Sequence, residues 1–204
     1  MRFGSTFLAL SFFANPLLAG PFIDVDFGGT CTKNNSQVLE NGDALSILLD
    51  DFGVRMPAGQ EGDGLETRKT CWMRLKVKPP AGRYLAGLEQ VYRGGLVKSA
   101  KASARVVLRY NLAQIDQERE ARNWPAGKEV RPEDPKSEFE YTVDDNLGDA
   151  RCGKTVNYAV HLVFVGRRPN FNNEFVLGSL DTVDVQLKKR RIQLKPRWKV
   201  CRDR

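Results

Sequence analysis

The chain has 204 residues, of which 41% are hydrophobic and 28% are charged, and its formal net charge at pH 7 is +7. About 185 residues remain beyond the N-terminal leader described below, which is the size of one ordinary domain. A domain of this size buries a real core, and this excludes a miniature scaffold in which disulfide bonds replace the core.

The first residues predict a secretory signal peptide over 1–19. Met1-Arg2 is a short positive start, residues 7–14 are an apolar run, and residues 17–20 are small enough for cleavage after Ala19. The apolar run is far shorter than the roughly 20 residues of a membrane-spanning helix, so we expect no transmembrane anchor. Pro21 stands where a lipoprotein signal has cysteine. We therefore expect residues 20–204 to be a secreted domain, extracellular or periplasmic.

Four segments alternate between apolar and polar residues with the period of a β-strand. They span residues 71–78, 103–112, 155–165 and 191–200. We expect each to be a half-buried strand with one wet face. The residues expected to face the core are Met73, Leu75, Val77, Ala104, Val106, Leu108, Tyr110, Leu112, Val156, Tyr158, Val160, Leu162, Phe164, Ile192, Leu194, Trp198 and Val200.

Turn signals separate these segments. They are Asn41-Gly42, residues 79–82, Gly94-Gly95, Gly148-Asp149 and Pro169-Asn170. Pro196 lies inside the last strand and has no N–H for a ladder, which predicts an edge strand or a bulge at that position.

One short helix is predicted over residues 114–122, followed by a charged, proline-broken stretch. We interpret residues 116–136 as a polar, mobile excursion between two strands. Many strands with little helix predict an all-β, single-domain antiparallel β-sandwich with at most a short helix.

Four cysteines, Cys31, Cys71, Cys152 and Cys201, are spread through the exported part of the chain. An oxidising compartment favours their pairing, and four cysteines allow three connectivities. We predict Cys31–Cys71 and Cys152–Cys201, because each of these pairs closes a local unit of neighbouring strands.

The residues that carry chemistry in enzymes form no recognisable catalytic set. The single histidine, His161, lies on the outward side of its strand, where we interpret it as a surface or half-buried polar residue. No Gly-x-Ser-x-Gly motif accompanies it, and the cysteines lack the C-x-x-C spacing of a zinc or redox site. Asp50 and Asp51 are adjacent at a strand end and point to opposite faces. We therefore predict no catalytic residues and no cofactor.

Three weaker patterns are typical of binding sites. Asp144, Asn146 and Asp149 resemble a calcium loop without its final glutamate, and a solvated turn is the alternative. Trp72 lies on the outward, basic face of its strand, where it either stacks on a sugar ring or packs under a loop. Lys195, Arg197 and Lys199 recur at every second residue of the last strand. They form a candidate surface for an anionic partner, or serve only solubility and edge protection.

The order of landmarks resembles a known family. The landmarks are residues 28–31 (Gly-Gly-Thr-Cys), 68–72 (Arg-Lys-Thr-Cys-Trp), 140–143 (Glu-Tyr-Thr-Val), 152–153 (Cys-Gly) and 198–201 (Trp-Lys-Val-Cys). Together they resemble the secreted "domain of unknown function 4360" family of fungi and some bacteria, over nearly all of the mature chain. The chain departs from that family where Thr32 replaces a proline. The resemblance implies a secreted, cysteine-paired β domain and no particular activity.

These observations favour a non-catalytic secreted or cell-envelope module that binds a surface, an anionic polysaccharide or a protein. Nucleic acid is not expected as a partner of an exported protein. Two alternatives stay open. One is a secreted hydrolase that uses carboxylates or a metal, and the other is a structural or inhibitor-like secreted protein.

Overall fold

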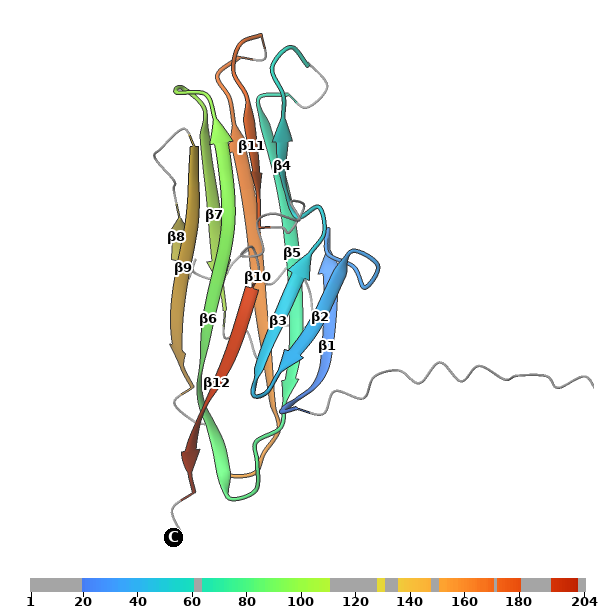
Figure 1. Ribbon diagram of the computed structural model, residues 1–204, viewed down its shortest axis with the longest axis vertical. Helices are drawn as coiled ribbons and strands as arrows, with labels where there is room; N and C mark the ends of the chain where they lie inside the picture. Colours follow the sequence, from blue (N-terminus) through green and yellow to red (C-terminus); the bar gives the residue numbers. More distant parts are fainter. Residues whose placement is uncertain are drawn as a thin grey trace, which may run out of the picture.

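The structure is a computed structural model that describes residues 20–60, 64–110, 128–130, 136–147, 151–170, 172–180 and 192–201. The described residues form twelve strands and no helix (Figure 1). Within those ranges no helix is long and apolar enough to cross a membrane. The helix expected over 114–122, Leu112 and the Gly148-Asp149 turn lie outside the described residues. Of the polar excursion expected over 116–136, Lys128–Val130 and Lys136 are described, and they belong to strands.

The first of two sheets has five antiparallel strands in the order β1-β5-β10-β7-β8. Its centre is the long pairing of β5 with β10, which runs from Val77 opposite Val156 to Glu66 opposite Arg167. The strands are β1 (Phe22–Gly29), β5 (Glu66–Val77), β7 (Ser103–Arg109), β8 (Lys128–Val130) and β10 (Val156–Arg167).

The second sheet has seven strands in the order β2-β3-β12-β6-β11-β4, with β9 on the other side of β6. The long strand β6 connects the whole sheet, because it pairs with β9 on one side and with β12 and then β11 on the other. The strands are β2 (Ser36–Asn41), β3 (Ala44–Leu49), β4 (Gly53–Met56), β6 (Arg83–Lys98), β9 (Lys136–Asn146), β11 (Val176–Ser179) and β12 (Ile192–Val200).

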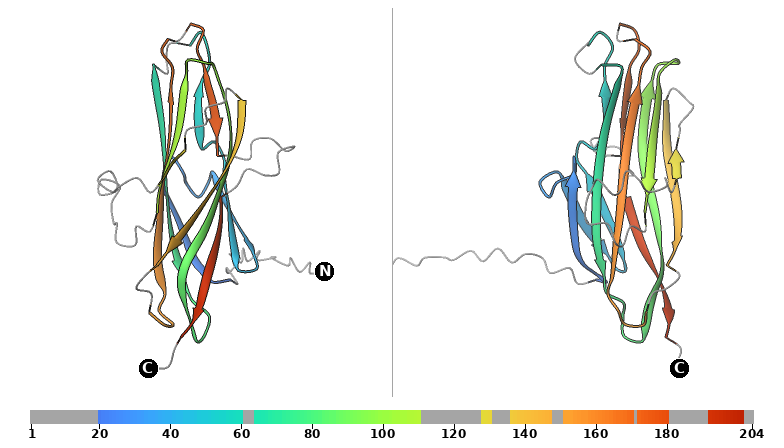
Figure 2. Two further views of the ribbon diagram at one scale, coloured as in Figure 1. Left: turned by 90° about the vertical axis from the view of Figure 1, so that its left-hand side faces the viewer. Right: turned by 180° about the vertical axis from the view of Figure 1, so that it is seen from behind.

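The two sheets lie face to face and form a β-sandwich (Figure 2). Their inner side chains make one continuous apolar core, as the period-two alternation predicted. In the first sheet, the core residues predicted on β5, β7 and β10 are buried or pack against this core, and Arg74, Lys76 and Lys78 are exposed. The fold class predicted from the sequence is therefore confirmed.

Two turn predictions have different outcomes. The turn predicted at Asn41-Gly42 is present: Asn41 ends β2, and Gly42, with a φ of +61°, begins the two-residue connection to β3. Gly94-Gly95, in contrast, lies in the middle of β6, so a turn there is wrong. A Cβ atom on Gly94 would lie 2.5 Å from the backbone oxygen of Ser179 and would collide with the ring of Phe139. Glycine is needed here because neighbouring groups approach the strand closely.

The alternation also misplaces two features. Strand β10 has no wet face over residues 158–166, because its outward residues Ala159, His161, Val163 and Val165 are buried as well. Val200, expected in the core, is 70% exposed. It is the last residue of β12, which runs past the packed part of the sandwich to the end that carries the C terminus (Figure 1).

Pro196 occupies a position of β12 that has a ladder partner on one side only. The pairing of β12 with β3 covers Ile192–Leu194, whereas its pairing with β6 continues to Val200. Pro196 therefore lies where β12 has become an edge, and the register against β6 shifts between Arg197 and Trp198. The prediction of an edge at Pro196 is confirmed, whereas the irregularity lies one residue further along the strand.

The two disulfide bonds have the predicted connectivity. Cys31–Cys71 joins the loop after β1 to β5, with a Cα–Cα distance of 5.1 Å, and both residues are buried. Cys152–Cys201 joins the loop before β10 to the residue after β12, with a Cα–Cα distance of 5.7 Å. The first bond therefore lies within one sheet, and the second ties the two sheets together.

A hydrogen-bonded polar group lies between the sheets. The Tyr158 hydroxyl on β10 donates to Asp145 Oδ2 on β9 at 2.8 Å and accepts from Gln90 Nε2 on β6 at 2.6 Å. The Tyr92 hydroxyl in turn donates to Gln90 Oε1. All four residues are buried, and each hydrogen bond offsets part of the cost of removing these groups from water.

Candidate functional site

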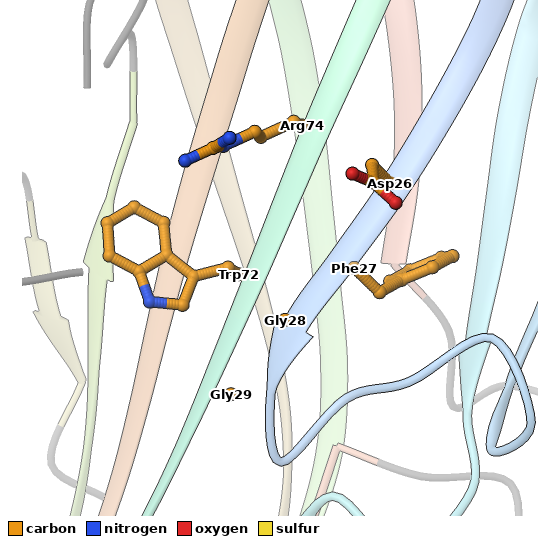
Figure 3. A pocket seen from close by; sticks show the side chains of 6 residues that line it. All are labelled: Asp26, Phe27, Gly28, Gly29, Trp72 and Arg74. Carbon is orange, nitrogen blue, oxygen red and sulfur yellow. The ribbon is translucent and has the colours of Figure 1, made fainter. Parts of the chain in front are cut away.

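A groove of about 280 Å³ lies on the outer face of the first sheet, where β1 pairs with β5 (Figure 3). Trp72 and Arg74 come from β5, and the remaining lining residues come from β1: Asp26, Phe27, Gly28 and Gly29. In Figure 3 the Trp72 and Arg74 side chains project to one side of β5, while Asp26 and Phe27 lie on the far side, along β1.

Strand register explains why these residues meet. Gly28 pairs with Trp72, and Asp26 pairs with Arg74, so each pair shares the outer face of the sheet. Gly28 contributes no side chain beside the indole, and a Cβ atom there would meet only the Trp72 Cβ at 3.8 Å. The groove is therefore open because position 28 is glycine, although the backbone there does not require glycine.

Gly29 has a different role. Its φ is +75°, and a Cβ atom on it would lie 2.5 Å from the Thr70 backbone oxygen. Only glycine fits this turn, which leads the chain from β1 to Cys31 and its disulfide bond with Cys71. The same turn thus anchors one end of the groove to the buried disulfide.

Trp72 is buried beneath the outer surface, contrary to the simplest form of the sugar-stacking prediction. Its exposed fraction is 6%, and its ring stacks on His161 with a centroid distance of 4.3 Å and an interplanar angle of 21°. One face of the indole is thus occupied by the imidazole. Trp72 therefore presents no freely exposed ring face on which a sugar in the groove could stack.

His161 is 1% exposed, so the expectation of a surface or half-buried histidine is wrong. It lies between Trp72 on β5 and Arg109 on β7 in the ladder. Arg109 Nη1 lies 3.3 Å from His161 Nδ1. Because a guanidinium only donates hydrogen bonds, Nδ1 acts as the acceptor and the imidazole proton lies on Nε2. His161 is thus held between the Arg109 guanidinium and the Trp72 ring.

The indole N–H of Trp72 is buried and has no acceptor among the described residues. A buried donor without a partner costs about 1–3 kcal/mol. Natural cores avoid such groups, and an exception calls for a specific explanation. Because this nitrogen has almost no exposed surface, an acceptor in the groove gains its hydrogen bond only when the ring of Trp72 shifts toward the groove.

Charged groups of both signs line the groove or lie next to it. Asp26 Oδ1 lies 3.7 Å from Lys33 Nζ, and both side chains are more than half exposed. Beside them, Asp24 and Lys76 form a second exposed pair at 3.2 Å. Exposed ion pairs of this kind contribute only about 0–1 kcal/mol, so Asp26 readily exchanges Lys33 for a ligand. The groove therefore brings a carboxylate, from Asp26, and a guanidinium, from Arg74, to the same face beside the Trp72 ring.

The candidate basic surface of Lys195, Arg197 and Lys199 is interrupted at its centre. Lys195 and Lys199 are exposed on β12, as predicted. The Arg197 guanidinium instead crosses β6 at Gly87, whose missing side chain leaves the space. It then donates to Asp144 Oδ2, the Asp145 backbone oxygen and Asn146 Oδ1 at 2.6–3.1 Å.

The same contacts account for two of the three candidate calcium ligands. Asp144 and Asn146 belong to strand β9 and hold the guanidinium of Arg197, while Asp149 lies outside the described residues. Among the residues that the structure describes, no group of three or more His, Cys, Asp or Glu side chains is arranged to hold a metal ion. Asp50 and Asp51 lie after the end of β3, where Asp51 has a φ of +63°.

Sequence reasoning identified Trp72 but missed Gly28, His161 and Arg109. The alternation of β5 and β10 placed Trp72 and His161 on outward faces. It contained no signal that the two strands are neighbours, or that residues 72 and 161 are opposite each other. Gly28 stood in a glycine-containing segment near the first cysteine, and its place across from Trp72 follows only from the register of β1.

No protein-family model matches this chain, and no curated protein matches it. Solved structures to which it is similar include TmCBM61 in complex with β-1,4-galactotriose, with 8% identity over 85% of this chain and 88% of that chain and a TM-score of 0.25. A CBM4 structure is 9% identical over 86% and 94%, with a TM-score of 0.24. A family 11 carbohydrate-binding module from Clostridium thermocellum, in complex with a mixed-linked tetrasaccharide, is 10% identical over 78% and 90%, with a TM-score of 0.19. TM-scores this low carry no argument about the ligand of the present chain.

Proposed function

We propose that this protein is a non-catalytic binding module that takes a carbohydrate into the groove between β1 and β5. The observation that carries the proposal is the buried indole N–H of Trp72, which lacks an acceptor beside a groove kept open by Gly28. Sugar hydroxyls both accept and donate hydrogen bonds, so one ring can donate to Asp26 and, after a small shift of the indole, accept from the Trp72 N–H. None of the groove residues is a Ser, Cys or His nucleophile.

We further propose that the module acts outside the cytoplasm, in the extracellular space or the periplasm. Two disulfide bonds support this location, because such bonds persist in oxidising compartments. Membership of the domain of unknown function 4360 family is likewise a proposal, supported by the landmarks around the four cysteines.

The test uses Gly28→Val, which fills the groove from a position where a Cβ atom is tolerated. The matched control is Gln37→Val, which puts the same side chain on an exposed position of β2 in the other sheet. Binding is measured by titration calorimetry against a panel of neutral and acidic polysaccharides. We expect Gly28→Val to weaken binding roughly tenfold or more by steric exclusion, and Gln37→Val to leave it unchanged.

Trp72→Phe distinguishes the contribution of the indole N–H to binding from the contribution of the open space in the groove. Phenylalanine keeps an aromatic ring against His161 but has no N–H, so affinity should fall about 3- to 10-fold, the value of one hydrogen bond. Equal binding by wild type and Gly28→Val, or no binding to any polysaccharide of the panel, would refute the proposal. Release of reducing ends from a bound polysaccharide would show instead that the protein is a hydrolase.

A further inference from the structure

The carboxylate of Glu40 holds the chain at Gly20, where the described part of the structure begins. The Gly20 backbone N–H donates to Glu40 Oε2 at 3.1 Å. Gly20 leads into β1 of the first sheet, and Glu40 belongs to β2 of the second. This contact therefore ties the two sheets together at the start of the domain.

The described residues donate a hydrogen bond to only one of the two carboxylate oxygens of Glu40. Its Oε2 accepts the bond from Gly20, but its Oε1 is buried and has no partner among the described residues. Removing a carboxylate from water is costly unless a positive charge or several donors replace the water. One amide N–H supplies a single neutral donor, whereas an ammonium group at the same atom supplies three donors and a charge.

Gly20 approaches the Glu40 carboxylate closely because it has no side chain. A Cβ atom on residue 20 would lie 3.1 Å from Glu40 Oε1 and 3.3 Å from its carboxyl carbon. A larger residue would therefore require the Glu40 carboxylate to shift by a few tenths of an ångström. Ala19-Gly20 is also the bond at which the N-terminal sequence predicts removal of a signal peptide.

We propose that a leader peptidase cleaves the Ala19–Gly20 bond and that Glu40 then binds the new α-ammonium group of Gly20. Hydrolysis consumes one water, leaves a carboxylate on Ala19 and an amine on Gly20, and this amine takes up a proton at neutral pH. The N terminus made by processing completes the hydrogen bonding of Glu40 and fastens β1 to β2. Processing thereby stabilises the exported domain.

The first test is the N-terminal sequence and intact mass of the exported protein, which should begin at Gly20. The second test compares two purified forms, one that begins at Gly20 and one that keeps a single extra alanine before it. Each form is made with Glu40 and with Glu40→Gln. In the Glu40 series the extra alanine should lower the melting temperature by about 2–4 °C, the size expected for one modest ionic interaction in a domain of this length.

In the Glu40→Gln series the extra alanine should have little effect, because the charged partner is gone. The difference in melting temperature between the two forms that carry Glu40 should also disappear as the pH rises through the pKa of the α-amino group, since the amine then loses its charge. Asp43→Asn, in the exposed turn after β2, is the matched control and should leave this difference in melting temperature unchanged. A mature N terminus elsewhere, or an equal effect of the extra alanine with glutamine at position 40, would overturn the proposal.

Discussion

At the residue scale, a hydrogen-bonded polar group in the core joins the two sheets. Tyr158 is the link between the sheets, because its hydroxyl bonds both Gln90 and Asp145. Burial raises the pKa of the Asp145 carboxyl above its ordinary value of 3.8, although the hydrogen bond from Tyr158 acts in the opposite direction. Burial also raises the pKa of Tyr92, so its hydroxyl stays a donor.

The raised pKa of Asp145 makes stability depend on pH. The folded protein holds the Asp145 proton more tightly than the unfolded chain, so this group favours folding most at acid pH. Its contribution is lost as the pH rises through the folded pKa. Asp145→Asn keeps an acceptor for Tyr158 but does not titrate. The free energy of unfolding of Asp145→Asn, relative to wild type, should therefore be higher at pH 7 than at pH 3 in urea titrations.

Tyr158→Phe is the companion variant. It removes the hydroxyl and leaves Gln90 and Asp145 each without one partner, which should cost about 1–3 kcal/mol at both pH values. If the difference in free energy of unfolding between Asp145→Asn and wild type were the same at pH 3 and pH 7, folding would not raise the pKa of Asp145.

At the element scale, β6 organises the second sheet through its glycines. Gly87 lets the Arg197 side chain cross from β12 to β9, and Gly94 admits the Phe139 ring and the Ser179 backbone. Strand interiors normally disfavour glycine. Here it permits three strands to meet along one long strand with close contacts on both of its sides.

Gly94→Ala should therefore destabilise the protein although alanine is the better strand residue. The new Cβ atom would lie 2.5 Å from the Ser179 oxygen, and overpacking of this kind costs about 1–3 kcal/mol. Gly28→Ala is the control, because its Cβ atom would meet only another Cβ at 3.8 Å. Urea unfolding of the two variants measures the difference, and equal stabilities would show that β6 adjusts freely at Gly94.

At the scale of the whole molecule, the two disulfide bonds stabilise different parts of the sandwich. One closes a sequence separation of 40 residues within the first sheet, and the other closes 49 residues and joins both sheets. In the chain-entropy account, loops of this length each stabilise the fold by about 4 kcal/mol. The core is large enough for the domain to fold without one of them.

Replacing Cys152 and Cys201 together by alanine should lower the free energy of unfolding by about 4 kcal/mol while the protein stays folded. Replacing Cys31 and Cys71 should cost more, because both are buried and alanine leaves a cavity. Chemical denaturation followed by circular dichroism measures both losses. A larger loss for the Cys152–Cys201 pair would contradict this ranking.

Local patterns in the sequence determined the all-β class, the direction of most strand faces and the disulfide connectivity. They were sufficient because side chains alternate strictly along a strand, and because each disulfide bond joins cysteines that are consecutive in the sequence. The same patterns predicted the turn at Asn41-Gly42 and the edge position of Pro196.

Only the tertiary structure decided which strands are neighbours and in what register, and the candidate site depends on both. The row Gly28–Trp72–His161–Arg109 combines residues from four strands that are far apart in the sequence. Gly94 looked like a turn residue because the pattern contained no signal of Phe139 or Ser179. Alternation is a property of one strand, whereas pairing, close approach and burial of outer faces follow from packing between distant segments, which a local pattern does not encode.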